Sequence, residues 1–160
     1  MSNLTRQQAV VAATQYLSEH AAGYFVTLNT ITTINPISTD LTHFNHQLTQ
    51  MATWLNEFCY GSQFRKRGAR LKIVTLPEQG LLKEGLHAHL VITYSPAMTK
   101  SHQEINAFIR RKWYRLIEAG GSVFGTLVDV KPLIDLEAAV NYSLKDFNKY
   151  TSDVLKVTFL

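Results

Sequence analysis

Residues 86–92 form an apolar, β-rich run with the sequence Leu86-His87-Ala88-His89-Leu90-Val91-Ile92. Glycine precedes the run and Ser95-Pro96 follows it, so the run predicts a strand. Side chains alternate between the faces of a strand, which places His87 and His89 on one face and the apolar side chains on the other. Two imidazoles so placed can share one metal ion. The alternative is that both are ordinary polar residues of a half-buried strand.

The composition is that of one soluble globular domain over residues 1–160. The chain is 46% hydrophobic and 18% charged, and its length suffices to bury a core. Its formal charge of +4 is compatible with nucleic acid but does not require it. The single cysteine, Cys59, lies in an apolar helical pattern that predicts a core position, and it fits a reducing compartment. No secretory signal or apolar run of membrane-spanning length is present, so we expect a cytoplasmic protein.

The remaining periodicities predict alternating helices and strands. We expect helices over residues 4–20, 40–61, 101–119 and 136–149, strands over 24–31, 71–76 and 123–130, and an edge strand within 154–160. Pro77 is expected to end the second strand, and residues 65–70 to form a basic turn. This order predicts an α+β fold, with a mainly antiparallel sheet of about five strands, flanking helices and a split βαβ, ferredoxin-like arrangement.

Glu78 is the favoured third metal ligand. It lies nine residues before His87, at the end of the preceding strand, and an antiparallel hairpin would bring it opposite the histidines. Glu84, in the glycine-bounded loop, is the competing ligand. Two imidazoles and a carboxylate suit a divalent metal, and imidazole suits Mn²⁺ better than Mg²⁺. His43 and His46 have no acidic partner nearby in sequence, so we interpret them as surface residues.

Tyr142 lies off the apolar stripe of the last predicted helix, roughly 200° from its centre at about 100° per residue. Lys145 and Lys149 share its side. A tyrosine in that position is not placed as a core residue. The alternative is an ordinary surface tyrosine packed over its neighbours.

Taken together, these features resemble the HUH endonucleases, in particular the single-tyrosine rolling-circle replication initiators (Rep proteins). The first motif of that family resembles the strand residues Phe25-Val26-Thr27-Leu28-Asn29. The histidine-hydrophobic-histidine motif matches His87-Ala88-His89, and the Tyr-x-x-Lys motif matches Tyr142 and Lys145. The motifs occur in the family's order, and the resemblance covers about residues 24–149. It also implies a carboxylate before the histidines, which supports Glu78.

The resemblance implies a metal-dependent nicking and joining endonuclease that initiates rolling-circle replication. Tyr142 would form a covalent 5′-phosphotyrosine and leave a free 3′-hydroxyl for a polymerase. Mn²⁺ or Mg²⁺ would stabilise the transition state, and Lys145 would neutralise charge or position the phenolate. The expected substrate is single-stranded or hairpin DNA at a replication origin, in a prokaryotic cytoplasm. The chain contains no Gly-x-x-x-x-Gly-Lys-Ser/Thr loop, so we expect no helicase domain and reliance on a host helicase.

Two groups of cations are candidate DNA-backbone contacts. They are Arg65, Lys66, Arg67 and Arg70 in the predicted turn, and Arg110, Arg111, Lys112 and Arg115 in the following helix. Some nearby aromatic residues are candidates for stacking on bases, although Trp113 is better explained as core. They are Tyr60, Phe64, Trp113 and Tyr114.

Two other functions fit parts of the pattern. The first is a single-tyrosine HUH transposase, which a glutamine four residues after the tyrosine would favour. That position is Asp146, while Lys145 fits the Rep pattern. The second is a nucleic-acid-binding module without catalysis, in which His87 and His89 are incidental. It leaves the joint arrangement of the motifs unexplained.

Overall fold

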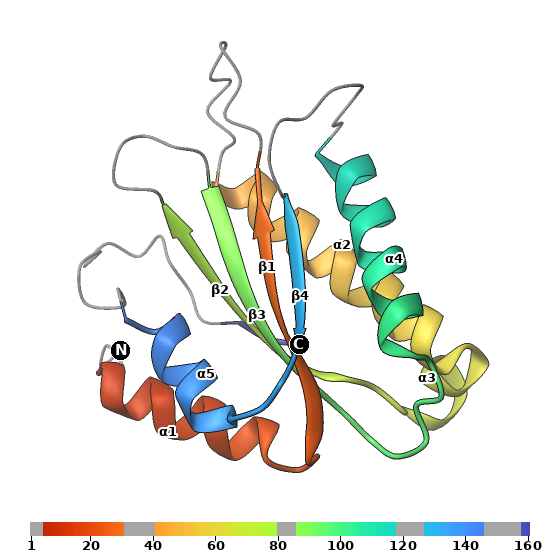
Figure 1. The fold of residues 1–160 in the computed structure, drawn as a ribbon, viewed down its shortest axis with the longest axis horizontal. Helices are drawn as coiled ribbons and strands as arrows, with labels where there is room; N and C mark the ends of the chain where they lie inside the picture. The colour runs from red at the N-terminus through yellow and green to blue at the C-terminus, as the bar shows by residue number, and fades with distance from the viewer. Residues whose placement is uncertain (1–4, 31–40, 80–85, 118–126, 146–157) are drawn as a thin grey trace.

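The computed structural model describes residues 5–30, 41–79, 86–117, 127–145 and 158–160. Five strands form one antiparallel sheet in the order β4-β1-β3-β2-β5 (Figure 1). The strands are β1 (Ala22–Asn29), β2 (Lys72–Gln79), β3 (Leu86–Tyr94), β4 (Val128–Pro132) and β5 (Thr158–Phe159). The predicted α+β fold with about five strands is therefore confirmed.

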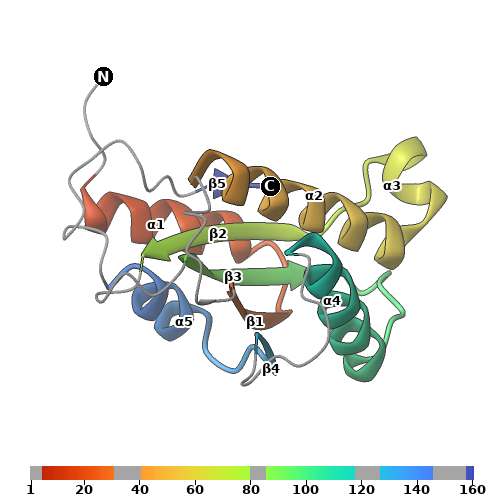
Figure 2. The same cartoon turned by 90° about the horizontal axis from the view of Figure 1, so that it is seen from above.

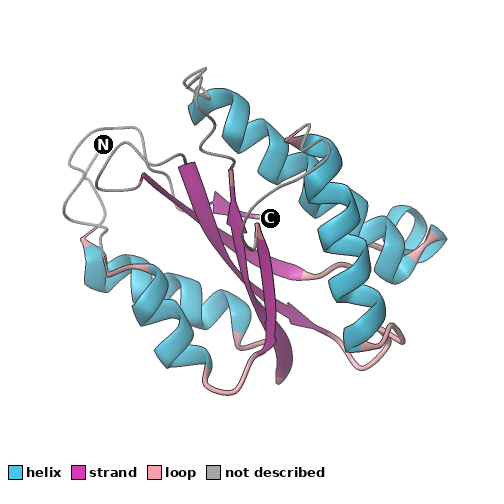
Figure 3. Cartoon of the chain, turned by 45° about the horizontal axis from the view of Figure 1, so that its top comes forward, coloured by secondary structure: helices cyan, strands magenta, loops and turns pink. Residues whose placement is uncertain are grey.

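Helices cover both faces of this sheet, as two views of the molecule show (Figures 2 and 3). One face carries α1 (Arg6–Leu17) and α5 (Leu136–Ser143), and the other carries α2 (Leu41–Tyr60) and α4 (His102–Leu116). A short helix, α3 (Ser62–Arg67), follows α2. Because β3 lies between β1 and β2, which α2 connects, the arrangement is the split βαβ type. None of the helices among the described residues is long and apolar enough to cross a membrane.

Strand alternation divides the interior into two cores. Val26, Leu90 and other apolar residues of β1 and β3 point toward α2 and α4, where Trp113 is fully buried. On the other face Val74 and Val91 pack against Ala13 of α1 and other residues of α1 and α5. Cys59 is buried in the first core, as predicted, and burial raises the pKa of its thiol to about 12. The first core holds most of the large apolar side chains, which leaves the α1–α5 face room for polar residues.

Local signals fix where three helices begin. Thr5 and Ser101 form capping boxes with Gln8 and Glu104, each satisfying two backbone N–H groups. The side chain of Asp135 accepts a hydrogen bond from the backbone N–H of Ala138 and begins α5. The caps at Ser101 and Asp135 confirm the predicted starts of these helices.

Two predictions between α2 and β3 are wrong. Residues 62–67 form a helix rather than a turn, because Gly61 adopts a positive φ of 53° that ends α2 and Gly68 closes α3 in the left-handed conformation. Pro77 does not end the second strand, which continues to Gln79. Among the described residues, β5 and Leu160 pair with β2 at Ile73, Val74 and Thr75, so no described strand pairs with Pro77 on that side, where a missing N–H is tolerated.

The C-terminal elements are shorter than predicted. The described part of the fourth strand runs from Val128 to Pro132, and the predicted residues 123–126 lie outside the described part. Helix α5 ends at Ser143 instead of continuing to 149, with Leu144 as its C-cap. The predicted edge strand is present as β5 beside β2. Glu84, Asp146 and Lys149 lie outside the described residues.

Candidate metal centre and neighbouring tyrosine

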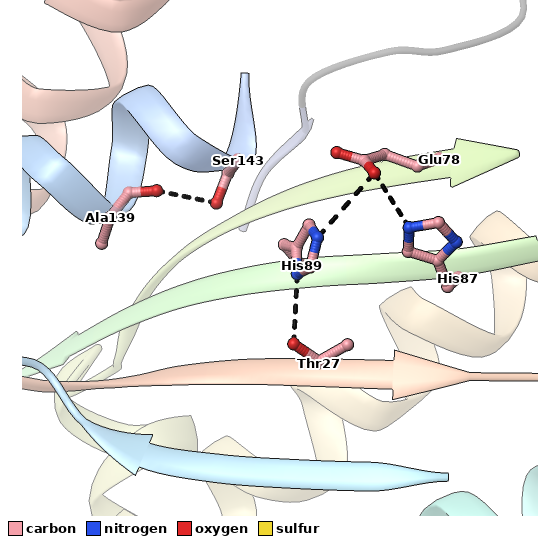
Figure 4. Close-up of polar contacts among 6 residues, drawn as sticks. All are labelled: Thr27, Glu78, His87, His89, Ala139 and Ser143. Atoms are coloured by element: carbon pink, nitrogen blue, oxygen red, sulfur yellow. Dashed lines mark hydrogen bonds and ion pairs between the residues drawn. The ribbon is translucent and has the colours of Figure 1, made fainter. Parts of the chain in front are cut away.

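The register of β2 against β3 brings the three predicted ligands together. Glu78 is the direct cross-strand partner of His87, and His89 lies two residues further along β3 on the same face. All three side chains lie on the α1–α5 side of the sheet, where Figure 4 shows both imidazoles within reach of the carboxylate. The continuation of β2 through Pro77 is what carries Glu78 into this register.

The donor atoms are spaced as a metal site requires. Nε2 of His87 lies 2.8 Å from Oε2 of Glu78, and Nε2 of His89 lies 3.8 Å from the same oxygen. One donor atom from each residue lies within 4.8 Å of the others. Metal–ligand bonds of about 2.0–2.2 Å, as in zinc sites, separate neighbouring donors by roughly 3 Å. These residues could therefore hold a metal ion, which would replace the direct contact between His87 and Glu78.

The carboxylate of Glu78 is short of partners. Its side chain is only 6% exposed. Oε1 is buried and has no hydrogen-bond partner within the described part of the chain. A buried carboxylate oxygen without a partner is costly, and a cation bound by both histidines would relieve that cost. This unsatisfied oxygen fits a metal-binding role for the cluster.

His89 is held in the form that a metal ligand needs. Burial lowers the pKa of its imidazole to about 4 even though the Glu78 carboxylate raises it, so the ring is neutral at pH 7. Nδ1 lies 3.1 Å from Oγ1 of Thr27. If Nδ1 carries the proton and donates it to this hydroxyl, the lone pair of Nε2 faces Glu78. The sequence did not identify Thr27 as a site residue. A usable signal was that Phe25 and Thr27, two residues apart, share one face of the predicted strand.

Tyr142 lies next to this cluster, on α5. Its ring centroid is 5.5 Å from that of His89 and 6.0 Å from that of Phe25, which itself stacks on His89 at 5.3 Å. Tyr142 is 52% exposed, and no other tyrosine, phenylalanine or tryptophan among the described residues is classed as exposed. Its phenol is therefore adjacent to a candidate metal ligand and accessible to a substrate.

Two lysines flank Tyr142. Nζ of Lys145 lies 4.2 Å from the centroid of its ring, and the backbone N–H of Lys145 donates to the Tyr142 carbonyl at 3.1 Å. On β4, Lys131 is directly opposite Phe25 and pairs with Asp129 at 2.8 Å. The predicted neighbours Tyr142 and Lys145 are thus together. Sequence reasoning missed Lys131 and Asp129, which only the pairing of β4 with β1 places here.

The predicted DNA-binding cations lie elsewhere. Arg65, Lys66 and Arg67 are on α3, Arg70 follows it, and Arg110, Arg111 and Arg115 are exposed on α4. Helix α4 covers the face of the sheet opposite the histidines, and α3 lies beyond the end of α2 (Figure 2). Among the predicted stacking residues, Tyr60 and Trp113 are buried, and Phe64 and Tyr114 pack partly against the core. The structure therefore does not bring these groups to the candidate metal centre.

Comparison of the chain with protein-family models, curated proteins and solved structures finds no match.

Proposed function

We propose that this protein is a metal-dependent endonuclease that cleaves single-stranded DNA through a covalent link to Tyr142, and that it initiates rolling-circle replication. The observation that carries the proposal is the exposed phenol of Tyr142 packed against His89 of the Glu78, His87 and His89 cluster. The sequence supports it through three motifs, which are the strand at residues 25–29, the His87-Ala88-His89 pair of histidines, and Tyr142 with Lys145. The resemblance to Rep proteins supplies the replication role, whereas the geometry supports only the nicking chemistry.

The residues suit phosphoryl transfer in three ways. A metal held by Glu78, His87 and His89 would withdraw charge from a bound phosphate. Tyr142 is half-exposed, so a phosphodiester can approach its ring. Lys145 supplies a positive charge beside the ring, where charge develops as the phenolic oxygen loses its proton.

The reaction follows from these positions. The Tyr142 oxygen attacks phosphorus and forms a phosphotyrosine ester, while the bond from phosphorus to the 3′-oxygen breaks. The phenol releases its proton to solvent, and the departing 3′-oxygen takes up a proton to become a hydroxyl. Because the ester preserves a phosphodiester bond, attack by a 3′-hydroxyl in the reverse direction rejoins DNA without a nucleotide cofactor.

The metal ligands alone do not select this chemistry. Two histidines and one carboxylate also occur at iron and zinc sites of other enzyme classes. What favours strand cleavage is the combination of that ligand set with an exposed tyrosine and two flanking lysines. An iron oxygenase needs neither this tyrosine nor these lysines.

A cleavage assay with a randomised pool of labelled single-stranded oligonucleotides tests this proposal. With Mn²⁺ we expect a shortened strand and a DNA–protein adduct that survives denaturation, and neither product with chelator. Tyr142→Phe should abolish the adduct. Tyr114→Phe is the matched control, because Tyr114 lies on α4 across the sheet and the change removes the same hydroxyl.

Three outcomes would contradict the proposal. An adduct that persists in Tyr142→Phe would assign the nucleophile elsewhere, with Tyr150 tested next. Cleavage without any adduct would indicate hydrolysis by metal-bound water. Binding without cleavage, on a pool shown to contain the origin of the source replicon, would support the non-catalytic module.

A further inference from the structure

The charges of this protein are divided between its two helical layers. The structure describes thirteen Lys and Arg residues, and nine of them lie in α3, in α4 or in the segments that adjoin these helices. The same layer, with α2 included, contains only two described carboxylates, Glu57 and Glu104. The α1–α5 side, which holds the candidate metal centre, has four described cations and five carboxylates. The basic character of the chain is therefore concentrated on one side.

Most of these nine cations lack a carboxylate partner. Arg65 pairs with Glu57, and Lys100 lies 4.0 Å from Glu104. The other seven make no ion pair with a described carboxylate. Arg111 and Arg115 are exposed four residues apart, on one side of α4. Like charges gathered without partners repel one another, so the arrangement favours binding of a polyanion.

The large aromatic side chains of this layer are not open for stacking. Phe58 stacks on Phe108 at 4.2 Å between centroids, and Nζ of Lys100 lies 4.7 Å from the Phe58 ring. Nζ of Lys112 lies 4.7 Å from the ring of Trp54. None of the described Phe, Tyr and Trp side chains of α2, α3 and α4 is more than partly exposed, and the exposed rings of this layer are those of His43, His46 and His102. Single-strand binding without sequence preference relies on aromatic side chains on which successive bases stack, and the large rings of this layer are mostly covered.

We propose that the exposed cations of α3 and α4, among them Lys66, Arg67, Arg111 and Arg115, bind the phosphate backbone of double-stranded DNA. They lie on helices and face outward, and α4 alone extends about 22 Å for its fifteen residues, enough to follow several phosphates. Contacts of these cations with phosphates carry no sequence information, so we expect binding that is largely independent of base sequence.

This duplex site is separate from the candidate metal centre. Val26, Leu90 and their neighbours face α2 and α4, whereas His89 lies against Tyr142 of α5. Helices lie on both sides of the sheet in Figure 3. The whole thickness of the sheet thus lies between the two. Binding of a duplex here requires neither the metal ligands nor Tyr142, so the site can be tested even if the proposed nuclease activity is absent.

Fluorescence anisotropy with a labelled 20-base-pair duplex of arbitrary sequence, in chelator and over a salt series, tests the proposal. Each phosphate contact contributes about −0.9 to the slope of log K against log salt. Arg111→Gln/Arg115→Gln should therefore flatten the slope by about 1.8 and weaken binding roughly 60-fold at 0.1 M salt. Lys66→Gln/Arg67→Gln, on α3, should act in the same way and keeps the test available if the first variant does not fold.

The matched control is Gln7→Glu/Gln15→Glu. It changes the net charge by the same two units, at exposed positions of α1 on the other side of the molecule. Its slope should stay that of the unaltered protein. The proposal is overturned if the control weakens binding as much as the α4 variant, if folded α3 and α4 variants bind normally, or if single-stranded DNA of the same length binds more tightly than the duplex.

Discussion

At the scale of single residues, Thr27 is the clearest positioning residue. Its hydroxyl lies 3.1 Å from Nδ1 of His89, and by accepting the Nδ1 proton it would leave Nε2 free to bind metal. Thr27→Val, which keeps the shape and removes the acceptor, should weaken Mn²⁺ binding roughly 10- to 100-fold, the range seen for such supporting contacts. Thr27→Ser should retain affinity within a few-fold. Calorimetric titration of Mn²⁺ without DNA measures both, and equal loss in the two variants would contradict the role of the hydroxyl.

The buried imidazole of His89 also predicts a pH dependence of stability. Its pKa is lowered from 6.5 to about 4, mainly by burial, in the protein without metal. Between these values the unfolded chain binds a proton at His89 that the folded protein does not. The stabilisation is therefore complete above about pH 6.5 and is lost as the pH falls toward 4. Urea unfolding at pH 7.5 and at pH 5 measures this effect. Between these two pH values the free energy of unfolding should fall less for His89→Gln than for the unaltered protein, and an equal fall in the two proteins would contradict the prediction.

At the scale of elements, α5 is held in place by a side chain of α1. Nε of Arg6 donates to the carbonyl of Leu144 at 2.9 Å, and Nη2 donates to the carbonyl of Asn141 at 3.1 Å. These are carbonyls at the end of α5, which have no partners within the helix. Arg6 thereby fixes the turn that carries Tyr142 and Lys145.

Removal of this contact should impair cleavage without affecting the metal. Arg6→Met is expected to destabilise the protein by about 2 kcal/mol, because two charged hydrogen bonds are lost, and to slow adduct formation at least tenfold. Mn²⁺ affinity should be unchanged, since β2 and β3 carry the ligands. Gln7→Met, at the neighbouring exposed position, is the control. If Arg6→Met loses metal affinity in parallel with cleavage, the effect is general unfolding and the positioning role is wrong.

The elements also show what the sequence could and could not predict. Periodicity and caps located the main helices and the His87 strand, because these signals are local. The split βαβ arrangement followed from the helix–strand alternation, whereas the order of the strands in the sheet was not predicted. The sequence predicted that the second strand ends at Pro77, but the strand continues through it. A proline is tolerated on the open side of an edge strand, and the sequence alone does not show which strands lie at an edge. The sequence correctly favoured Glu78 as a neighbour of the histidines. That Glu78 lies directly opposite His87 could be seen only once the pairing of β2 with β3 was known.

At the scale of the whole molecule, the division of charge could not be predicted. The sequence identified the cations of α3 and α4, but not the face of the sheet that these helices cover. The same limit hid Lys131 and Asp129, which lie opposite Phe25 and Thr27 only because β4 pairs with β1. Long-range packing, rather than any local pattern, assigns these groups to the two sides.

The separation of the two sides has a measurable consequence. Arg111→Gln/Arg115→Gln should leave Mn²⁺ affinity unchanged within about twofold at 0.15 M salt, because α4 and the ligands lie on opposite faces of the sheet and screening at that salt acts over about 8 Å. Calorimetric titration checks this. A change of tenfold would mean that the two faces are coupled, contrary to the arrangement described above.

The central claim is that Tyr142 becomes covalently attached to DNA, and peptide mass spectrometry tests it most directly. After reaction with Mn²⁺ and a cleavable oligonucleotide, the protein is digested with nuclease and trypsin. The account predicts that the peptide ending at Lys145 gains the mass of a nucleotide, with fragment ions placing it on Tyr142. A nucleotide on any other residue, or none in a sample that has cleaved its DNA, would contradict the account.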